Sequence, residues 1–534
     1  MPTEPPRLDQ TSPVAESRRA WLILAIVWAA FAVVILVPGN VVITSHWGDA
    51  LHLVDILDRM SQGQQPHRDF VTPLGELAFS PISALMAAGM PTGRAYLTVQ
   101  ILLAGGLGAA GLAIALRRMP WVWALLFACA IIIITAALVH GRPESSLSIN
   151  VHYNRWSWAL GFVALLAALL EPVRTRSWEG VFIGAAMAAL ALIKVTYFVA
   201  FLPLVVLGLV VTGQIRSLIT ALATGAGVAV LLTILWGADY WQAYFGDLLY
   251  VAGADARPNA GGGVLRMVTG PRVLAPVALT AVAVAVLFRG GMQRKGVLLI
   301  CAFLSGAYVS DQNAGFDPLF LGFVALLLLV WGRGLGDGRR IALTMISLGL
   351  GVAVAPNAFN LATSPARAAL ADRSGFVPLV IGSSRHQDIL LERGAALSGG
   401  QTHLGFDGQR PFFGQQPLAP VEFQGEALPV CESLISPAFF ASIAADLAER
   451  DLAQGQTIFV ADFLSPLWLF GDHPPLIGAA PWSYGGLHGI ENADVVLVPV
   501  CPNRMSVHRL ILDALEETPM TELLRTPLYR LYAL

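Results

Sequence analysis

The segment from Trp47 to Glu76 carries a dense group of ionisable side chains. Its sequence, WGDALHLVDILDRMSQGQQPHRDFVTPLGE, follows the first apolar segment of a strongly hydrophobic chain. It holds four aspartates, one glutamate, two arginines and two histidines. A carboxylate held near a membrane surface can accept the proton of an incoming hydroxyl, or it can bind a metal ion. We therefore expect the chemistry of this protein in this segment.

Part of this segment has the pattern of an amphipathic helix. Apolar residues recur at helical spacing at positions 51, 54, 57 and 60, which predicts one buried face. The same pattern predicts that Asp55, Asp58 and Arg59 face water. Asp49 and Asp69 are not explained by the apolar stripe, so we treat both as functional candidates. Asp49 also follows the first apolar segment closely enough to be held at a fixed depth near the bilayer surface.

The second half of the segment has irregular backbone, because prolines at positions 66 and 73 impose turns. Arg68, Asp69 and Glu76 are therefore presented from loops at the predicted membrane interface. Arg68 can bind a lipid phosphate, or it can form an ion pair with Asp69 or Glu76. Both interpretations of Arg68 stay open.

The composition is that of an integral membrane protein. The chain has 534 residues, of which 56% are hydrophobic and only 13% are charged. The formal net charge is −2, and Lys194 and Lys295 are the only lysines. Since no run of basic residues is present, we expect no nucleic-acid partner.

Eleven apolar segments predict about eleven transmembrane helices between residues 20 and 355. Several are shorter than the roughly 20 residues that a spanning helix prefers. Residues 77–90 are also apolar, but they are few and include Pro81, so we interpret them as a re-entrant or interfacial helix, with a true span as the alternative. The segments lie near residues 20–38, 95–116, 121–139, 156–170, 181–195, 198–211, 218–236, 273–288, 297–310, 319–331 and 341–355.

The arginines predict the orientation of these segments. If the polar tail at 1–19 is cytoplasmic, alternate connections carry short basic turns, from Arg117 and Arg118 to Arg339 and Arg340. The opposite connections, including the first loop at 39–94, hold most of the carboxylates. An odd number of spans then places the C-terminal region outside. We therefore predict a multi-pass protein of the inner (plasma) membrane with a cytoplasmic N-terminus and an extracytoplasmic C-terminal region.

From Pro356 the composition becomes that of a soluble α/β domain, which we place at 356–534. Cys431 and Cys501 lie in this region and can form a disulfide if it faces an oxidising compartment. Trp482 and His488 also lie here, but nothing in the sequence raises them above ordinary loop residues. The predicted elements are a helix from Ser436 to Gly455, strands at 456–461 and 494–500, and a second helix at 506–517.

Six further positions outside the first loop are candidates for binding a substrate. Lys194 interrupts two apolar segments, and a lysine there needs an anionic partner such as a lipid phosphate or a loop aspartate. Arg155 precedes another segment and can bind a phosphate or extend to the interface. Asp311 and Asn313 can hydrogen-bond sugar hydroxyls or cap neighbouring helices. His152 and Asn154 complete the set of candidates.

The early aspartate, followed by G-Q-x-P-x-R-D-F and P-L-G, resembles the first external loop of C-type (GT-C superfamily) membrane glycosyltransferases. These enzymes use polyprenyl-phosphate-linked sugars and include protein mannosyltransferases and lipid A aminoarabinose transferases. The resemblance implies that Asp49 is the general base that activates an acceptor hydroxyl, and that transfer inverts the anomeric centre. The chain departs from the common pattern at Ala50, where many members have a second acid, and at Thr72, where many have lysine or histidine.

The resemblance makes a glycosyltransferase the expected function, with a polyprenyl-phosphate sugar as donor and a glycan, lipid or protein as acceptor. It implies no certain cofactor, although a divalent metal is compatible with the acidic loop. Two other classes compete with this prediction. A transporter or flippase of lipid-linked glycans would carry ionisable residues within several spans, whereas these spans are nearly free of them apart from Lys194. A non-catalytic envelope assembly protein would keep its function without Asp49.

Overall fold

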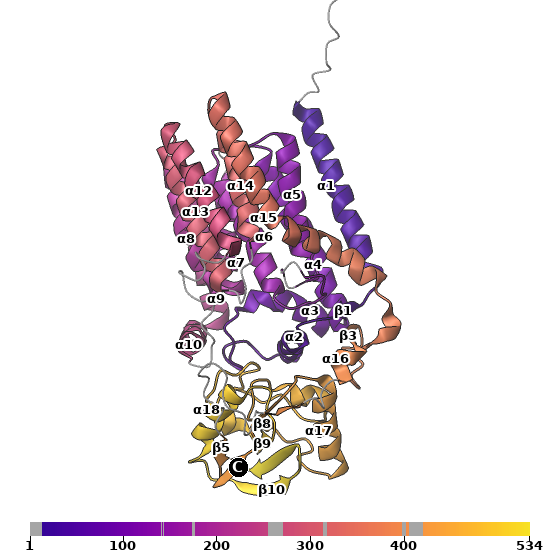
Figure 1. Cartoon of the computed structure of the whole chain (residues 1–534). Coiled ribbons are helices and arrows are strands. Elements are labelled where there is room, and N and C mark those ends of the chain that lie inside the picture. Colours follow the sequence, from indigo (N-terminus) through magenta and orange to yellow (C-terminus); the bar gives the residue numbers. More distant parts are fainter. Residues whose placement is uncertain are drawn as a thin grey trace, which may run out of the picture.

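The computed structural model describes residues 13–139, 141, 144–173, 177–254, 271–312, 318–397, 402–404 and 420–534. Long helices form a bundle, and a smaller body that contains β-sheets lies beyond one end of it (Figure 1). The bundle contains α1 (Pro13–Leu36), α4 (Thr92–Ala115), α5 (Trp121–Ala136), α6 (His152–Leu169), α7 (Ser177–Ile193), α8 (Val195–Val211), α9 (Ile215–Trp236), α12 (Pro271–Arg289), α13 (Gln293–Gln312), α14 (Leu319–Gly332) and α15 (Asp337–Leu370).

The bundle helices are compatible with embedding in a membrane. Among the described residues, four helices are long and apolar enough to cross a bilayer, namely those at Val14–Leu36, Thr92–Ala115, Ile215–Trp236 and Asp337–Leu370. Each of the eleven predicted apolar segments overlaps one helix of the bundle. Large apolar side chains also point outward, as at Ile234 on α9, which is 74% exposed. An apolar outer surface of this kind is typical of lipid contact.

The segment between α1 and α4 lies across the end of the bundle, against the sheet-containing body (Figure 1). It forms β1 (Val41–Ile43), α2 (Trp47–Ser61), the short helix η1 (Glu76–Ala78) and α3 (Ser80–Ala87). At eight residues, α3 is too short to span a bilayer. The stretch at 77–90 is therefore folded as short helices rather than as a span.

The helix α2 buries more of its surface than its sequence pattern predicts. Leu51, Val54 and Leu57 of the apolar stripe are buried as expected, and Met60 is partly buried. The prediction that Asp55, Asp58 and Arg59 face water is wrong, because they are only 0%, 6% and 1% exposed. The sheet-containing body covers this face, where the Trp468 indole N–H donates to Asp55 and Arg59 donates to Asp55 Oδ1 at 2.6 Å.

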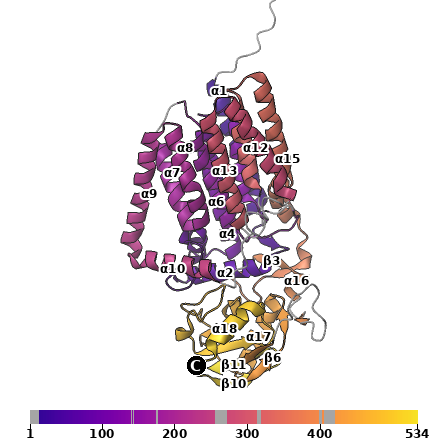
Figure 2. The ribbon, with the colours of Figure 1, turned by 60° about the vertical axis from the view of Figure 1, so that its left-hand side comes forward.

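Two helical connections bring further residues to the same end of the bundle. The helices α7 and α8 are separated by Lys194 alone, whose backbone is extended. After α9 the chain turns into α10 (Asp239–Gly253), which runs across the end of the bundle (Figure 2). The Tyr244 hydroxyl on α10 donates to the Ala191 carbonyl at 2.6 Å and so holds α10 against the end of α7.

The sheet-containing body begins after α15, which continues past Pro356 to Leu370. Its largest sheet has the strand order β10-β11-β9-β8. The two strands expected from the sequence correspond to β8 (Ile458–Val460) and β9 (Val495–Pro499), which pair in parallel. The predicted helices are α17 (Pro437–Glu449) and α18 (Met505–Leu515). The hairpin of β10 (Thr521–Arg525) and β11 (Tyr529–Ala533) completes the sheet.

Two details of α17 differ from the prediction. The helix ends at Glu449 rather than near Gly455, because Asp451 and Ala453 adopt positive φ angles that end the helical hydrogen-bond pattern. Ser436 precedes the helix, but its hydroxyl donates to the Ala396 carbonyl instead of capping the first turn.

Smaller strands complete the body and tie it to the chain before α2. The strand β1 pairs in parallel with β3 (Ile389–Glu392), which pairs in turn with β2 (Phe376–Pro378). The remaining elements are η2 (Arg373–Gly375), α16 (Arg393–Leu397), β4 (Thr402–Leu404), β5 (Val421–Phe423), β6 (Glu426–Leu428), β7 (Cys431–Ser433), η5 (Pro466–Phe470) and η6 (Ile490–Asn492).

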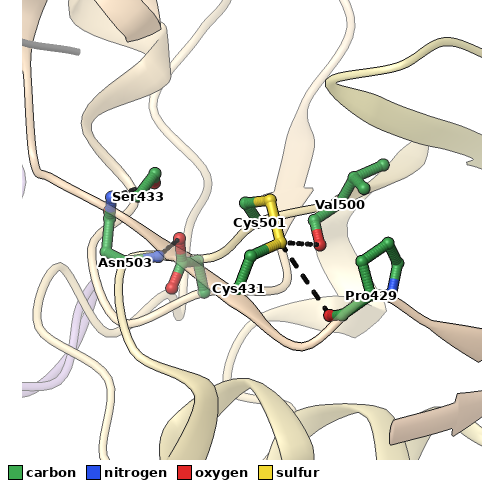
Figure 3. The surroundings of a disulfide bond; sticks show 7 residues. Pro429, Cys431, Ser433, Val500, Cys501 and Asn503 are labelled. Atoms are coloured by element: carbon green, nitrogen blue, oxygen red, sulfur yellow. Dashed lines mark hydrogen bonds between the residues drawn. A yellow bond between two sulfur atoms is a disulfide. The ribbon is translucent and has the colours of Figure 1, made fainter. Parts of the chain in front are cut away.

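A disulfide joins Cys431 on β7 to Cys501, which follows β9 (Figure 3). The two cysteines are separated by 70 positions in the sequence. Next to the disulfide, the Asn503 side-chain amide donates to the Ser433 hydroxyl at 3.1 Å. The cross-link therefore fixes the start of one strand to the end of another within the C-terminal body.

Candidate functional site

Asp49 lies in the first turn of α2, at the junction of the bundle with the C-terminal body. Its side chain is partly buried, and burial raises the pKa of the carboxyl group. The nearby positive charge of His46 and the Asn150 side chain oppose this increase. Because a carboxylate with a raised pKa is a better proton acceptor once ionised, Asp49 is suited to the role of a base.

Tyr153 connects Asp49 with Lys194. It lies in the first turn of α6, outside the apolar segment predicted at 156–170. Burial raises the pKa of its hydroxyl, and the negative charge of Asp49 raises it further. The Lys194 ammonium lies 5.3 Å from the centre of the Tyr153 ring and donates to Asn154 Oδ1 at 2.9 Å. Tyr153 is therefore in contact with the hairpin lysine and is also influenced by the charge of the loop aspartate.

The first loop packs directly on the α7–α8 hairpin. The Gly75 amide donates to the Ile193 carbonyl at 3.2 Å, one residue before Lys194. A side chain at Gly75 would overlap the backbone of Leu192, so only glycine permits this approach. The contact fixes Glu76, the next residue, beside the hairpin.

Glu76 is an acid held in a largely apolar environment. Burial raises its pKa from 4.5 to about 7. Its Oε2 atom is buried and accepts no hydrogen bond from the described residues. Its charge raises the pKa of Tyr240 on α10, whose hydroxyl is also buried. Near neutral pH, Glu76 can therefore either donate or accept a hydrogen bond.

An apolar cavity of about 450 Å³ lies beside Lys194. Side chains of α7, α8 and α9 line it, together with Trp241, Tyr244 and Phe245 of α10. Leu192 and Val195, which lie on either side of Lys194 in the sequence, both contribute to its wall. A hydrocarbon chain in this cavity would have its polar end near the lysine.

An aromatic residue of the C-terminal body packs on α2 about one helical turn after Asp49. The rings of Trp482 and His52 meet edge to face at 5.2 Å, and burial lowers the pKa of His52 to about 4. The Tyr484 and Tyr250 rings meet edge to face at 6.3 Å, which packs this part of the C-terminal body against α10. No sequence pattern identified Trp482 or Tyr484 as a partner of these elements, although the run PWSYGGLHG combines aromatic residues with glycines that form tight turns.

Two candidates from the first loop have structural partners. Arg68 forms an ion pair with Asp239 at 2.5 Å, so the predicted partners Asp69 and Glu76 are wrong. The arginine still keeps a third of its side chain exposed. Asp69 accepts a hydrogen bond from the Gln65 amide at 2.6 Å, which stabilises the turn after Pro66. Neither contact brings Asp69 to Asp49.

His152 and Arg155 are buried in the structure that supports the site. His152 is 0% exposed, and its Nε2 atom lies 2.7 Å from the Ala78 carbonyl oxygen. Arg155 is 1% exposed and donates to the Asn150 carbonyl at 3.2 Å and to the Tyr96 hydroxyl at 3.1 Å. These contacts position the loop before α6 and do not present the guanidinium at an open surface.

The last two candidates belong to the end of α13 and to the residue that follows it in the sequence. Asp311 is in the last turn of α13 and is partly buried. Asn313 lies outside the described residues. In the part of the chain that the structure describes, no group of three or more histidine, cysteine, aspartate or glutamate side chains is arranged to hold a metal ion.

Comparison with known proteins leaves the family open. No protein-family model matches the chain, and a search of curated proteins finds no match. The function must therefore be inferred from the residues and their arrangement.

Proposed function

We propose that this protein is a membrane glycosyltransferase that moves a sugar from a polyprenyl-phosphate donor to an acceptor hydroxyl on the extracytoplasmic face. The observation that supports it most is that the Lys194 ammonium lies 5.3 Å from the centre of the Tyr153 ring, while the charge of Asp49 acts on the hydroxyl of the same tyrosine. Asp49 and Lys194 are 145 positions apart in the numbering of the chain, and they are the types that such a reaction needs, a base and a cation. The resemblance of the first loop to C-type glycosyltransferases agrees with this assignment.

The apolar cavity supports a lipid-linked donor. A polyprenyl chain needs an apolar surface, and its phosphate needs a cation to replace water. The cavity between α7, α8 and α9 offers the apolar surface. Lys194 offers the cation, since its two sequence neighbours in the hairpin, Leu192 and Val195, are part of the cavity wall. The hydrogen bond from Lys194 to Asn154 holds the ammonium at this position.

The chemistry follows from the two charged groups. The acceptor hydroxyl attacks the anomeric carbon of the donor while Asp49 takes the hydroxyl proton. A new glycosidic bond forms as the bond between the anomeric carbon and the phosphate oxygen breaks. The lipid phosphate leaves with the electron pair, and its negative charge is stabilised by Lys194. Attack from the side opposite the phosphate inverts the anomeric centre.

The proposal includes a membrane topology. Eleven spanning helices, α1, α4 to α9 and α12 to α15, would place the N-terminus in the cytoplasm and the C-terminal body outside the inner membrane. The disulfide between Cys431 and Cys501 supports this orientation, because structural disulfides persist in oxidising compartments. The basic connections at the end of the bundle far from α2 support it as well.

The test is transfer by purified protein in proteoliposomes with radiolabelled polyprenyl-phosphate sugars and a membrane extract as acceptor. The Asp49→Asn variant should lose about 100-fold or more of turnover while donor binding is retained. The matched control is Asp337→Asn, which changes an exposed aspartate at the start of α15. Transfer that survives Asp49→Asn would contradict the proposal, and no transfer by the wild type would favour an assembly protein or a flippase.

A second substitution tests the donor side. Lys194→Gln should raise the donor KM by about tenfold or more, because a charged hydrogen bond to phosphate is lost. Lys295→Gln is the control, since it alters the other lysine of the chain, on α13. An unchanged donor KM in Lys194→Gln would remove the lysine from the donor site.

A further inference from the structure

Both carboxylates of the helix α10 are bound by residues of the first loop. They belong to Asp239 and Asp247, and the helix contains no glutamate, histidine, lysine or arginine. Asp247 is 8% exposed, and its Oδ2 atom lies 2.8 Å from His67 Nδ1 and accepts a hydrogen bond from the Thr72 amide at 3.0 Å. Asp239 forms an ion pair with Arg68. The charged groups of α10 therefore have partners within the protein.

The outward side of α10 is apolar. Phe245 is 54% exposed and Leu249 is 73% exposed. Together with the partly buried Trp241, they lie four positions apart and so share one side of the helix. On a helix whose outer side contacts water, charged residues face outward and large apolar residues face the protein. The reverse arrangement in α10 is the one expected where the outer side contacts hydrocarbon.

The place of α10 in the fold brings this side next to the membrane. The preceding helix α9 is long and apolar enough to cross a bilayer. After it, the chain turns and α10 runs across the end of the bundle (Figure 2). The Trp241 indole N–H donates to the Thr233 hydroxyl at 2.8 Å, one residue before the exposed Ile234 of α9. The apolar outer surfaces of the two helices therefore meet, as in an interfacial helix that follows a spanning one.

The apolar cavity of about 450 Å³ lies on this same side of α10. Trp241 and Phe245 line it together with residues of α7, α8 and α9. Phe245 is thus part of the cavity wall and is also more than half exposed. A side chain with both properties marks a place where the cavity is open to the outside. The opening lies on the helix side that we expect to contact hydrocarbon.

We infer that α10 is an interfacial helix whose Trp241, Phe245 and Leu249 contact the acyl chains of membrane lipids, and that the cavity opens into the bilayer beside Phe245. The contact with lipid does not depend on the proposed function. The entry of a polyprenyl phosphate through this opening rests on the proposed function, since it gives the route of that donor to Lys194.

Nitroxide labels on the full-length protein in nanodiscs of phosphatidylethanolamine and phosphatidylglycerol test the contact with lipid. Each label is attached to one new cysteine, after alanine has replaced the free cysteines Cys129 and Cys301. Oxygen concentrates in hydrocarbon, whereas a polar nickel chelate stays in water. The ratio of collisions with oxygen to collisions with the chelate should be about tenfold higher at Leu249→Cys than at Leu523→Cys. Leu523 is 48% exposed on β10 and is the reference for contact with water.

The reference for contact with lipid is Leu231→Cys, at a residue of α9 that is 53% exposed. A ratio at Leu249 close to that at Leu231 supports the inference. A ratio equal to that at Leu523 would place α10 in water and overturn it. Spectral broadening by a second nitroxide, in discs that hold two copies of the protein, would show that another copy covers this side, which overturns the inference as well.

A label at Phe245→Cys tests the opening of the cavity. Adding polyprenyl phosphate to the nanodiscs should lower the collisions of this label with oxygen by about twofold or more, because a chain in the cavity covers the side chain. Leu249→Cys is the matched control on the same helix and should change little. No decrease at residue 245, or an equal decrease at both residues, overturns the opening.

These outcomes are independent of the outcome of the transfer assay. A protein that transfers sugar and has α10 in water would keep the proposed function and lose this inference. A protein that transfers no sugar and has lipid at Leu249 would keep the interfacial helix and lose the transferase assignment.

Discussion

At the scale of single residues, the behaviour of Asp49 decides whether it is a base. Burial raises its pKa, and a base must be ionised to accept a proton. The rate constant kcat/KM for transfer should therefore fall as pH falls through this raised pKa, at a higher pH than an exposed aspartate would give. His46→Ala should move the acid limb to still higher pH, because the His46 charge opposes the increase. A pH profile without an acid limb would contradict this role.

The raised pKa of Glu76 predicts that the stability of the folded protein depends on pH. Its pKa is 4.5 when exposed and about 7 in the folded protein, so the folded protein binds more protons between these values. The stabilising effect of its protonated form is present below about pH 4.5 and is lost as pH rises to about 7, a loss of roughly 3 kcal/mol. In Glu76→Gln, the apparent melting temperature should change less with pH over this range.

Glu491→Gln, which changes an exposed glutamate of the C-terminal body, is the control for Glu76. The control should keep the wild-type pH dependence. If Glu76→Gln kept it too, another group would be responsible for the change in stability.

At the scale of elements, the contact of the first loop with the α7–α8 hairpin should be sensitive to one methyl group. In Gly75→Ala the new Cβ atom would overlap the Leu192 backbone and break the hydrogen bond to Ile193. Transfer should fall about tenfold or more, because a small displacement of substrate-positioning elements is enough to misalign the reacting groups. Gly246→Ala in α10 is the control, since nothing lies within 4 Å of its Cβ position. Equal activity of the two variants would show that this contact does not position the site.

Sequence periodicity predicts elements better than it predicts what covers them. Each apolar segment of the bundle overlaps a helix, and the break at Lys194 is visible as a single polar residue between two such segments. The burial of Asp55 and Arg59 was not predictable from the α2 pattern, because their partner Trp468 lies more than 400 positions away.

At the scale of the whole molecule, the buried pair of Asp55 and Arg59 joins the bundle end to the C-terminal body. Arg59 donates to Asp55 at 2.6 Å and to the Leu476 carbonyl at 2.8 Å. Arg59→Ala would leave the Asp55 carboxylate buried without its cation, at a cost of about 3 to 5 kcal/mol. The C-terminal body should then be cut faster in limited proteolysis.

The control for this prediction is Arg450→Ala, which breaks a half-exposed pair with Asp446 and should cost about 1 kcal/mol or less. The double variant Asp55→Leu with Arg59→Met should recover most of the resistance, since it leaves no unpaired charge. Proteolysis of Arg59→Ala at the wild-type rate would show that this pair does not hold the two bodies together.

The pairing of β1 with β3 shows why the arrangement of the two bodies could not be predicted. Val41 lies beside Ile389, and neither short strand has a pattern that identifies its partner. Local propensity is enough to predict β8 and β9, because both strands are continuous apolar runs. It cannot predict which distant segments meet, because those contacts depend on the packing of the complete chain.

The roles proposed for Asp49 and Lys194 can be tested by a structure of the full-length protein with a non-hydrolysable polyprenyl-phosphate sugar bound. We expect the phosphate within hydrogen-bonding distance of Lys194 Nζ and the lipid in the cavity of α7, α8 and α9. The anomeric carbon should face the side where Asp49 lies. A phosphate bound away from Lys194, or a sugar separated from Asp49 by the protein, would contradict it.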